Sequence, residues 1–214
     1  MRELRPAARR FLTRADGIET RHSFSYGAHY DPSNVGWGAL AAINTEHLDP
    51  GAGYDTHRHE DVEIVTWVTD GALAHQDSTG HGGVVEPGVT QRLSAGSGAE
   101  HSERNASDIR PLTFVQMMLR SEHWGAPEYA SLDIPDGPGR HRAVEVRAAG
   151  WLEVVRPVEQ VEIEVEARLL VHVTRGVIDV DGQSLGPGDE LRLLAPEPTV
   201  RLHGDGEALV WHLA

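Results

Sequence analysis

The chain has 214 residues, of which 39% are hydrophobic and 24% charged, proportions that are typical of a soluble globular protein. Its net charge of −14 argues against direct binding to nucleic acid, because such binding requires clustered cations. The chain contains no cysteine and no lysine, so thiol chemistry, sulfur-ligated metal sites and Schiff-base chemistry are excluded.

The N-terminal segment, residues 1–14, is rich in arginine but lacks the apolar core of a secretory signal. No apolar run approaches the roughly 20 residues that a membrane-spanning helix needs. We therefore expect a cytoplasmic protein that does not bind membranes, and we expect it to be a monomer.

Short β-branched runs that end in Gly, Pro or Asp follow one another along the chain, and helical periodicity is scarce. These runs cover residues 63–77, 83–88, 113–119, 169–182, 189–194 and 208–213. The pattern predicts an all-β protein of the sandwich or barrel type.

Two halves of the chain repeat one order of strand, turn, strand, Pro-Gly and strand, at residues 70–93 and 175–193. A stretch rich in Gly and Pro separates them. We expect an N-terminal domain at residues 1–130, a linker at 131–142 and a related C-terminal domain at 143–214.

The first half contains two pairs of candidate metal ligands. His57 and His59 stand at the head of a predicted strand, where alternate side chains share a face about 6.6 Å apart along the backbone. His101 and Glu103 repeat this spacing after a Gly-rich approach. Two such pairs on facing strands would give a His/His/His/Glu pocket, which suits a transition metal with open coordination positions.

The motifs around these pairs are specific. The spacing Gly51-x5-His57-x-His59-x3-Glu63 resembles the first cupin motif, and Gly98-x2-His101-x3-Asn105 resembles the second. The chain further resembles the bacterial pirins in HSFSY (22–26), YDPSNVGWGAL (30–40), THRHEDVEIVTWVTDGALAHQDSTGHGG (56–83) and QRLSAGSGAEHSE (91–103). The resemblance runs over most of residues 5–130 and becomes a general bicupin pattern thereafter.

This resemblance implies two tandem jelly-roll β-barrels of the cupin type, with a metal site only in the first. It implies His57, His59, His101 and Glu103 as ligands of one divalent metal ion, with Fe²⁺ expected and Mn, Ni, Co, Cu or Zn as alternatives. The acid of the general cupin motif would be Glu63, whereas pirins use the position of Glu103. We therefore expect Glu63 to orient a histidine instead.

Two classes of function follow from the resemblance. The first is quercetin 2,3-dioxygenase activity, in which O₂ opens the ring of a flavonol or a related enol or catechol, with Glu103 as the catalytic base. The second is a non-enzymatic, iron-binding and redox-sensitive regulatory protein that acts through a protein partner. Turnover separates the two, and we favour the enzyme.

Other side chains that could bind a ligand are expected to be structural. His75 and His81 are predicted to be strand-end or loop residues rather than ligands. The C-terminal histidines share no ligand spacing, and they are His172, His203 and His212. The tryptophans expected in the core are Trp37, Trp67 and Trp124.

Overall fold

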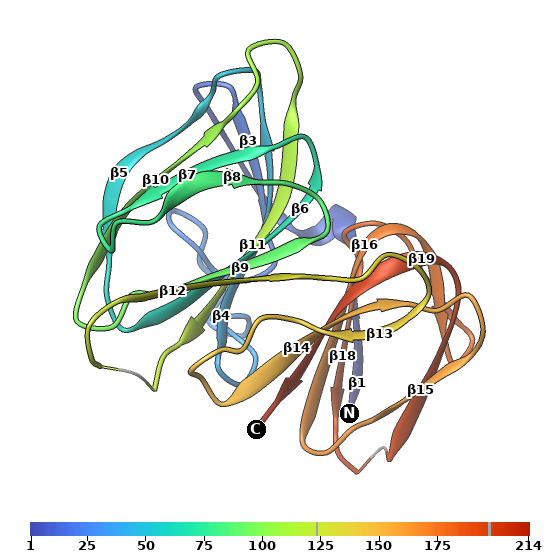
Figure 1. Ribbon diagram of the computed structural model, residues 1–214. Helices are drawn as coiled ribbons and strands as arrows, with labels where there is room; N and C mark the ends of the chain where they lie inside the picture. Colours follow the sequence, from blue (N-terminus) through green and yellow to red (C-terminus); the bar gives the residue numbers. More distant parts are fainter. Residues whose placement is uncertain (123, 197) are drawn as a thin grey trace. The chain divides into compact units, whose positions relative to one another are not determined.

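The computed structural model describes residues 1–122, 124–196 and 198–214. Within these ranges the chain forms nineteen strands and one short 3₁₀ helix, η1 (Ala7–Arg9), and contains no α-helix (Figure 1). The all-β prediction is therefore confirmed. No helix in the described ranges is long and apolar enough to cross a membrane.

The chain divides into two compact units. The N-terminal unit comprises Phe11–Asp133 with Val146–Ala148, and contains a seven-stranded and a four-stranded antiparallel sheet. The larger sheet has the order β12-β9-β6-β11-β4-β3-β2, with β2 (Phe11–Ala15), β3 (Ile18–His22), β4 (Leu40–Leu48), β6 (Val62–Asp70), β9 (Val89–Ser94), β11 (Leu112–Arg120) and β12 (Glu128–Asp133). The smaller has the order β5-β10-β7-β8, with β5 (Gly53–His59), β7 (Leu73–Asp77), β8 (Gly82–Val85) and β10 (Ala99–Asn105).

Two apolar clusters pack against opposite ends of β6 and β11 in the N-terminal unit. One buried cluster includes Ile64, Leu93 and Met118, and another includes Val68 and Phe114. Because alternate residues of a strand point to the same face, the stretch of each strand between these clusters can present polar side chains to the same interior.

The C-terminal unit comprises Met1–Arg10, Ile134–Glu145 and Ala149–Ala214. Its eight-stranded sheet follows the order β1-β18-β16-β19-β14-β13, with β15 paired to β19 and β17 to β16. The strands are β1 (Arg2–Arg5), β13 (Gly139–Arg142), β14 (Gly150–Arg156), β15 (Val161–Glu164), β16 (Arg168–Val180), β17 (Gln183–Leu185), β18 (Glu190–Leu194) and β19 (Thr199–Leu213). Alternate residues of β16, among them Leu169, Val171 and Val173, enter one apolar core.

A bulge bends β16 where its pairing with β19 shifts between Val173 and Arg175. Gly176 follows it with a φ of 67°, and a Cβ atom there would lie 2.0 Å from the carbonyl oxygen of Asp205. Glycine is therefore required at this position.

Composition did not predict the strand pairing of two segments, the first residues of the chain and residues 131–142. β1 pairs with β18, so the first residues of the chain join the C-terminal unit. The expected linker at 131–142 contains the end of β12 and all of β13. Edge strands such as these are held by backbone hydrogen bonds, which need no apolar side-chain pattern. The boundary of the N-terminal domain at residue 130 stays a prediction.

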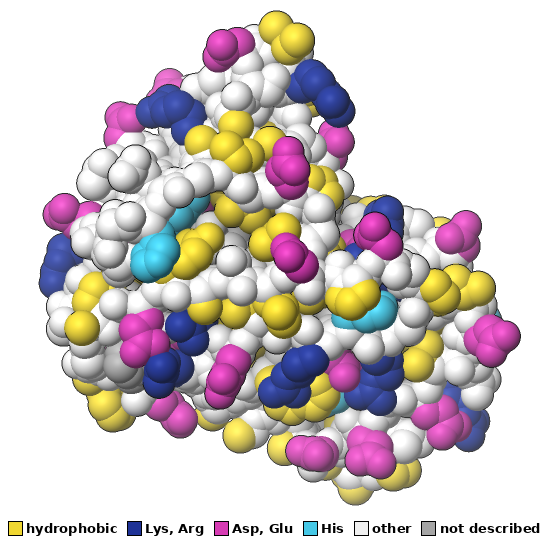
Figure 2. All heavy atoms as spheres, viewed as in Figure 1, with side chains coloured by type: hydrophobic (Ala, Val, Ile, Leu, Met, Phe, Trp, Pro, Cys, Tyr) yellow, Lys and Arg dark blue, Asp and Glu magenta, His cyan; other side chains and the backbone are white. Residues whose placement is uncertain are grey.

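Charged side chains of both signs are interspersed on the face shown in Figure 2. Exposed ion pairs also occur on the molecule, as in Arg201 with Glu162. Exposed pairs of this kind contribute little stability each, about 0–1 kcal/mol.

Candidate metal centre

The four predicted ligands lie on two neighbouring strands of the smaller sheet. β5 carries His57 and His59, and β10 carries His101 and Glu103. His101 stands directly opposite His57, so their side chains share a face, and the register shifts between His101 and Glu103. A Cβ atom on Gly53 would lie 2.4 Å from the carbonyl oxygen of Glu103, so this close approach of the strands depends on glycine.

The side chains converge. The ligand atoms of His57, His59 and His101 all lie within 4.8 Å of one another, and their ring centroids are 4.4–5.0 Å apart. Glu103 and His101 form a second such group with His75, again within 4.8 Å. The structure thus places the four predicted residues in two overlapping groups that share His101, and the second group includes His75, which the sequence reading set aside.

Several of these atoms are buried without a hydrogen-bond partner. They are Nε2 of His59, both ring nitrogens of His101 and Oε1 of Glu103. His57 differs, because its Nδ1 lies 2.8 Å from the carbonyl oxygen of Asp55 and only Nε2 remains for another contact. Buried polar atoms normally have partners, so an unpaired set of imidazole nitrogens and a carboxylate oxygen fits a metal ion.

Burial shifts the pKa values of three of these candidate ligands. It lowers the pKa of His59 to about 4, and the neighbouring His57 adds to this effect. It likewise lowers the pKa of His101 to about 3 and raises that of Glu103 to about 7. Near neutral pH, His59 and His101 are therefore neutral, which is the form that binds metals.

Glu103 is oriented from the opposite sheet. Nε2 of Gln116, on β11, donates a hydrogen bond of 2.7 Å to Oε2 of Glu103. Since this bond occupies one carboxylate oxygen, the other, Oε1, is the oxygen without a partner. Gln116 therefore helps to fix the orientation of the Glu103 carboxylate.

Gln116 belongs to a row of buried polar side chains that crosses the larger sheet. Each member is the direct pairing partner of the next, in the order His22, Asn44, Gln116, Thr66 and Gln91. Our sequence reading missed this row. Its signal is a single polar residue in the middle of an otherwise apolar strand, as in FVQMM and IVTWV.

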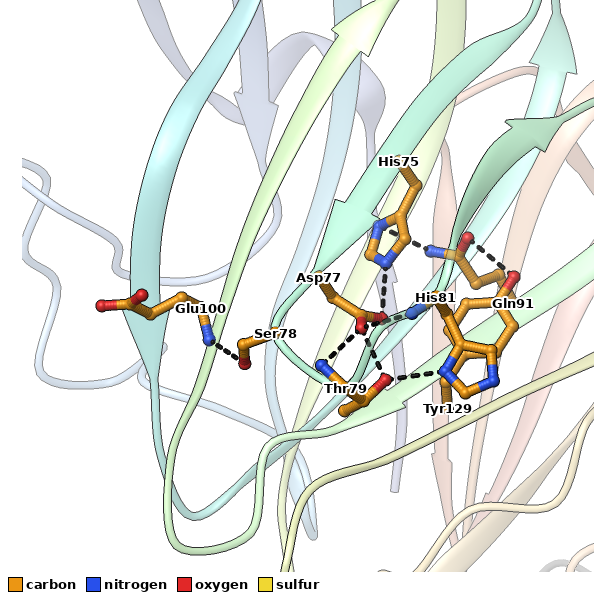
Figure 3. Close-up of polar contacts among 8 residues, drawn as sticks. All are labelled: His75, Asp77, Ser78, Thr79, His81, Gln91, Glu100 and Tyr129. Atoms are coloured by element: carbon orange, nitrogen blue, oxygen red, sulfur yellow. Dashed lines mark hydrogen bonds and ion pairs between the residues drawn. The ribbon is translucent and has the colours of Figure 1, made fainter.

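A second member of the row, Gln91, holds His75 (Figure 3). Its Nε2 lies 3.3 Å from Nδ1 of His75, and its Oε1 accepts a hydrogen bond from the hydroxyl of Tyr129. Nε2 of His75 then donates to Asp77 at 3.0 Å. Both ring nitrogens of His75 are thus engaged, while its ring packs 5.6 Å from that of His101.

The loop after β7 adds further hydrogen bonds to Asp77, the partner of His75 (Figure 3). Oδ1 of Asp77 accepts hydrogen bonds from the backbone N–H and the hydroxyl of Thr79. The Thr79 hydroxyl lies 2.7 Å from Nδ1 of His81, whose ring stacks on Tyr129. His81 is an exposed loop residue, as expected, whereas His75 is a buried residue in the middle of β7.

Glu63 has partners other than the histidine that we expected. It is fully buried on β6, and its carboxylate accepts hydrogen bonds from the hydroxyls of Ser94 and Ser121, both at 2.6 Å. The backbone N–H of Arg147 donates a third, at 3.2 Å. Ser94 is its direct pairing partner on β9, which explains why the carboxylate is held there.

Replacing Glu63 by Gln should therefore destabilise the fold and leave metal content unchanged. A carboxamide keeps one acceptor oxygen and turns its NH₂ group toward donors, so at least one buried hydroxyl loses its partner. We expect a loss of about 1–3 kcal/mol in urea unfolding. The exposed Glu60→Gln variant serves as the control, and reduced metal content in Glu63→Gln would contradict this assignment.

The histidines that we expected to be structural in the C-terminal domain have other partners. His172 lies 3.3 Å from Glu190, and the ring of His212 stacks on Trp151 at 3.6 Å. His203 is largely exposed, 3.7 Å from Asp179. No group of three candidate ligands occurs in the C-terminal unit among the described residues.

The three tryptophans that we expected in the core differ in burial. Trp67 is buried in the core, as predicted, and Trp37 is half-buried. Trp124 is 70% exposed, so its prediction as a core residue is wrong. It lies in a Gly/Pro-containing loop after β11, where no strand holds the side chain inside.

A cavity of about 440 Å³ opens beside the metal-ligand cluster in the N-terminal unit. Its wall includes His57, His59, Glu103 and Gln116, together with residues of β3 and β4. This volume is within the range of pockets that bind small organic ligands.

Residues 5–119 match the family model described as Pirin. An Escherichia coli protein named quercetin 2,3-dioxygenase is 31% identical over 97% of this chain and 95% of its own length. A Mycobacterium bovis relative carries that enzyme name provisionally and is 36% identical over 99% of this chain and 94% of its own.

Two solved structures of one Escherichia coli protein are similar to this chain over its whole length. YhhW from Escherichia coli has a TM-score of 0.95 and 29% identity, and covers 100% of this chain and 98% of its own. A second structure, with a TM-score of 0.93 and 29% identity over 100% and 99% of the two chains, is the bacterial pirin YhhW in complex with nickel(II). The expectation of two tandem cupin barrels is confirmed, and the chain belongs to the pirin family.

Proposed function

We propose that the protein binds one divalent transition metal ion through His57, His59, His101 and Glu103, and uses it to oxygenate a flavonol such as quercetin or a related enol or catechol. Fe²⁺ is the ion that we favour. The quercetin 2,3-dioxygenase name of the Escherichia coli relative and the nickel(II) complex of YhhW support the proposal.

One observation carries the metal part of this proposal. Three buried ring nitrogens and one buried carboxylate oxygen have no hydrogen-bond partner, and they belong to residues whose side chains converge. Leaving each such atom unpaired costs about 1–3 kcal/mol, so four together are difficult to explain without a ligand.

When bound, the ion supplies open coordination positions, Lewis acidity and redox chemistry for the reaction of an aromatic ligand with O₂. The chain supplies the proton acceptor. Gln116 positions the carboxylate of Glu103 and leaves its Oε1 without a partner, and a pKa raised by burial suits this carboxylate to take the proton of a substrate hydroxyl near neutral pH.

The test is oxygen consumption with quercetin by iron-loaded protein, followed by oxygen electrode and by loss of flavonol absorbance. Metal-stripped protein is the control. If both samples consume oxygen at the rate of buffer alone, the enzyme proposal is wrong.

Metal affinity should weaken as the pH falls below about 7, because Glu103 must lose its proton on binding. Between about pH 5 and 6.5, Glu103 is protonated in the metal-free protein, whereas His59 and His101 are neutral. Glu103 therefore contributes one released proton, or about tenfold in affinity per pH unit, and the two imidazoles contribute none.

Zinc titrations at several pH values would measure this effect. Glu103→Gln should lower the slope of log affinity against pH by one in that window. Equal slopes for the wild type and the variant would show that Glu103 does not release the proton.

A further inference from the structure

The wall of the cavity beside the metal-ligand cluster contains two tyrosines, Tyr26 and Tyr54. The Tyr54 hydroxyl donates a hydrogen bond of 2.8 Å to Oε2 of Glu46, so it already has an acceptor within the protein. The Tyr26 hydroxyl, in contrast, makes no hydrogen bond to any residue that the structure describes. A phenol in a cavity wall with no acceptor in the protein can donate its hydrogen bond to a ligand.

A two-residue turn holds Tyr26 at the cavity. The backbone N–H of Tyr26 donates to the carbonyl oxygen of His29 at 3.1 Å, and the N–H of His29 donates to that of Tyr26 at 3.0 Å. The ring of His29 stacks on that of Phe11, with centroids 5.2 Å apart, and this contact ties the turn to β2. Gly27 and Ala28, between the two ends of the turn, also line the cavity.

The ring of Tyr26 is held as well as its backbone. It stacks on the ring of His22, on β3, with centroids 5.2 Å apart and 16° between the planes. Both nitrogens of that imidazole are engaged, because Nδ1 lies 2.9 Å from Oδ1 of Asn44 and Nε2 lies 2.9 Å from Oγ1 of Thr13. A ring fixed in this way loses little conformational freedom when a ligand binds, so its hydroxyl is preorganised.

The Tyr26 hydroxyl lies on the side of the cavity where Glu103 lies. Burial is the main cause of the raised pKa of Tyr26, and the negative charges of Glu46 and Glu103 raise it further. Since electrostatic interactions weaken with distance, both carboxylates are near the phenol, and both line the same cavity. Tyr26 is therefore a neutral hydrogen-bond donor close to the carboxylate of Glu103.

We propose that Tyr26 is a binding residue that donates a hydrogen bond to one of the two adjacent oxygens, ketone and 3-hydroxyl, of a flavonol held in the cavity. The inference rests on the proposed function in taking a flavonol as the ligand and in placing its hydroxyl beside Glu103. Glu103 takes the proton of that hydroxyl, and Tyr26 stabilises the negative charge that this leaves on the two conjugated oxygens. Hydrogen bonds to charged acceptors are the stronger ones.

Two flavonols provide the probe. 3-Hydroxyflavone and quercetin share the ketone and the 3-hydroxyl, whereas quercetin has further hydroxyls on its other rings. Binding is measured by fluorescence titration without oxygen, on protein loaded with Zn²⁺, which has no redox chemistry. Tyr26→Phe keeps the ring and its stack on His22 but removes the hydroxyl, so we expect both flavonols to bind about tenfold more weakly, at unchanged zinc content.

Tyr30→Phe is the matched control. It removes a hydroxyl from a side chain that is 77% exposed and outside the cavity wall, so it should leave both affinities unchanged. Urea unfolding separates binding from a structural role. Because the Tyr26 hydroxyl has no partner among the described residues, Tyr26→Phe should unfold at the same urea concentration as the wild type.

Unchanged affinity of Tyr26→Phe for both flavonols, or a loss confined to quercetin, would overturn the inference. A marked loss of stability in Tyr26→Phe would overturn it too, since the hydroxyl would then have a structural role, and so would the absence of flavonol binding to the wild type. These outcomes are separable from the fate of the enzyme. Weaker binding by Tyr26→Phe without oxygen consumption by the iron-loaded wild type would reject the enzyme and keep the role of Tyr26. Oxygen consumption with unchanged affinity in Tyr26→Phe would do the reverse.

Discussion

Replacing His101 by Ala is expected to abolish tight metal binding, with one ion per chain in the wild type. His101 is 1% exposed, both of its ring nitrogens lack partners, and it is the residue shared by the two groups of candidate ligands. Changes to residues that merely orient a ligand cost about 10–100-fold in metal affinity, so removing a ligand should cost more than about a hundredfold.

Elemental analysis after dialysis against a weak chelator would measure this loss. His203→Ala is a matched control, because it removes an exposed histidine from the C-terminal unit. Two tightly bound ions per wild-type chain, or a full complement in His101→Ala, would contradict the proposed site.

Glu103→Gln is expected to slow oxygen consumption with quercetin by about a hundredfold or more, expressed per bound ion. A carboxamide can offer an oxygen to a metal but cannot accept the proton of the substrate hydroxyl, and loss of a general base commonly costs that much. Its one oxygen also has two potential partners, because Gln116 already donates to this side chain. Metal content must therefore be measured in the same samples.

Wild type, Glu103→Gln and metal-stripped protein would be compared by oxygen electrode and by flavonol absorbance. If all three bleach quercetin at the same rate, the reaction is autoxidation in solution. The regulatory interpretation, in which the metal controls binding of a protein partner, would then become the better one.

The site illustrates what strand periodicity can predict. A spacing of two residues places His57 with His59, and His101 with Glu103, on shared faces of their strands, because side chains alternate at every residue. Their convergence depends only on β5 and β10 being neighbours. The family resemblance supplied that pairing, which the spacing alone does not contain.

The residues around the ligands were harder to predict. His75 lies within the run that we had assigned as a strand. Its place beside the ligands follows from the pairing of β7 with β10, which sets His75 directly opposite Glu103. Glu63 has the spacing of a metal ligand, yet its partner on β9 is Ser94, so its carboxylate is satisfied elsewhere. Trp124 was misplaced because its loop contains no alternation from which burial could be inferred.

The sequence by itself determined the fold class, the two pairs of candidate ligands and the exclusion of thiol and amine chemistry, because these follow from residue type and from local spacing. Only the tertiary structure decided which atoms are left without partners, and that Gln116 orients Glu103. These features depend on the register between strands far apart in the chain. Register is set by the packing of whole sheets, and no single segment encodes it.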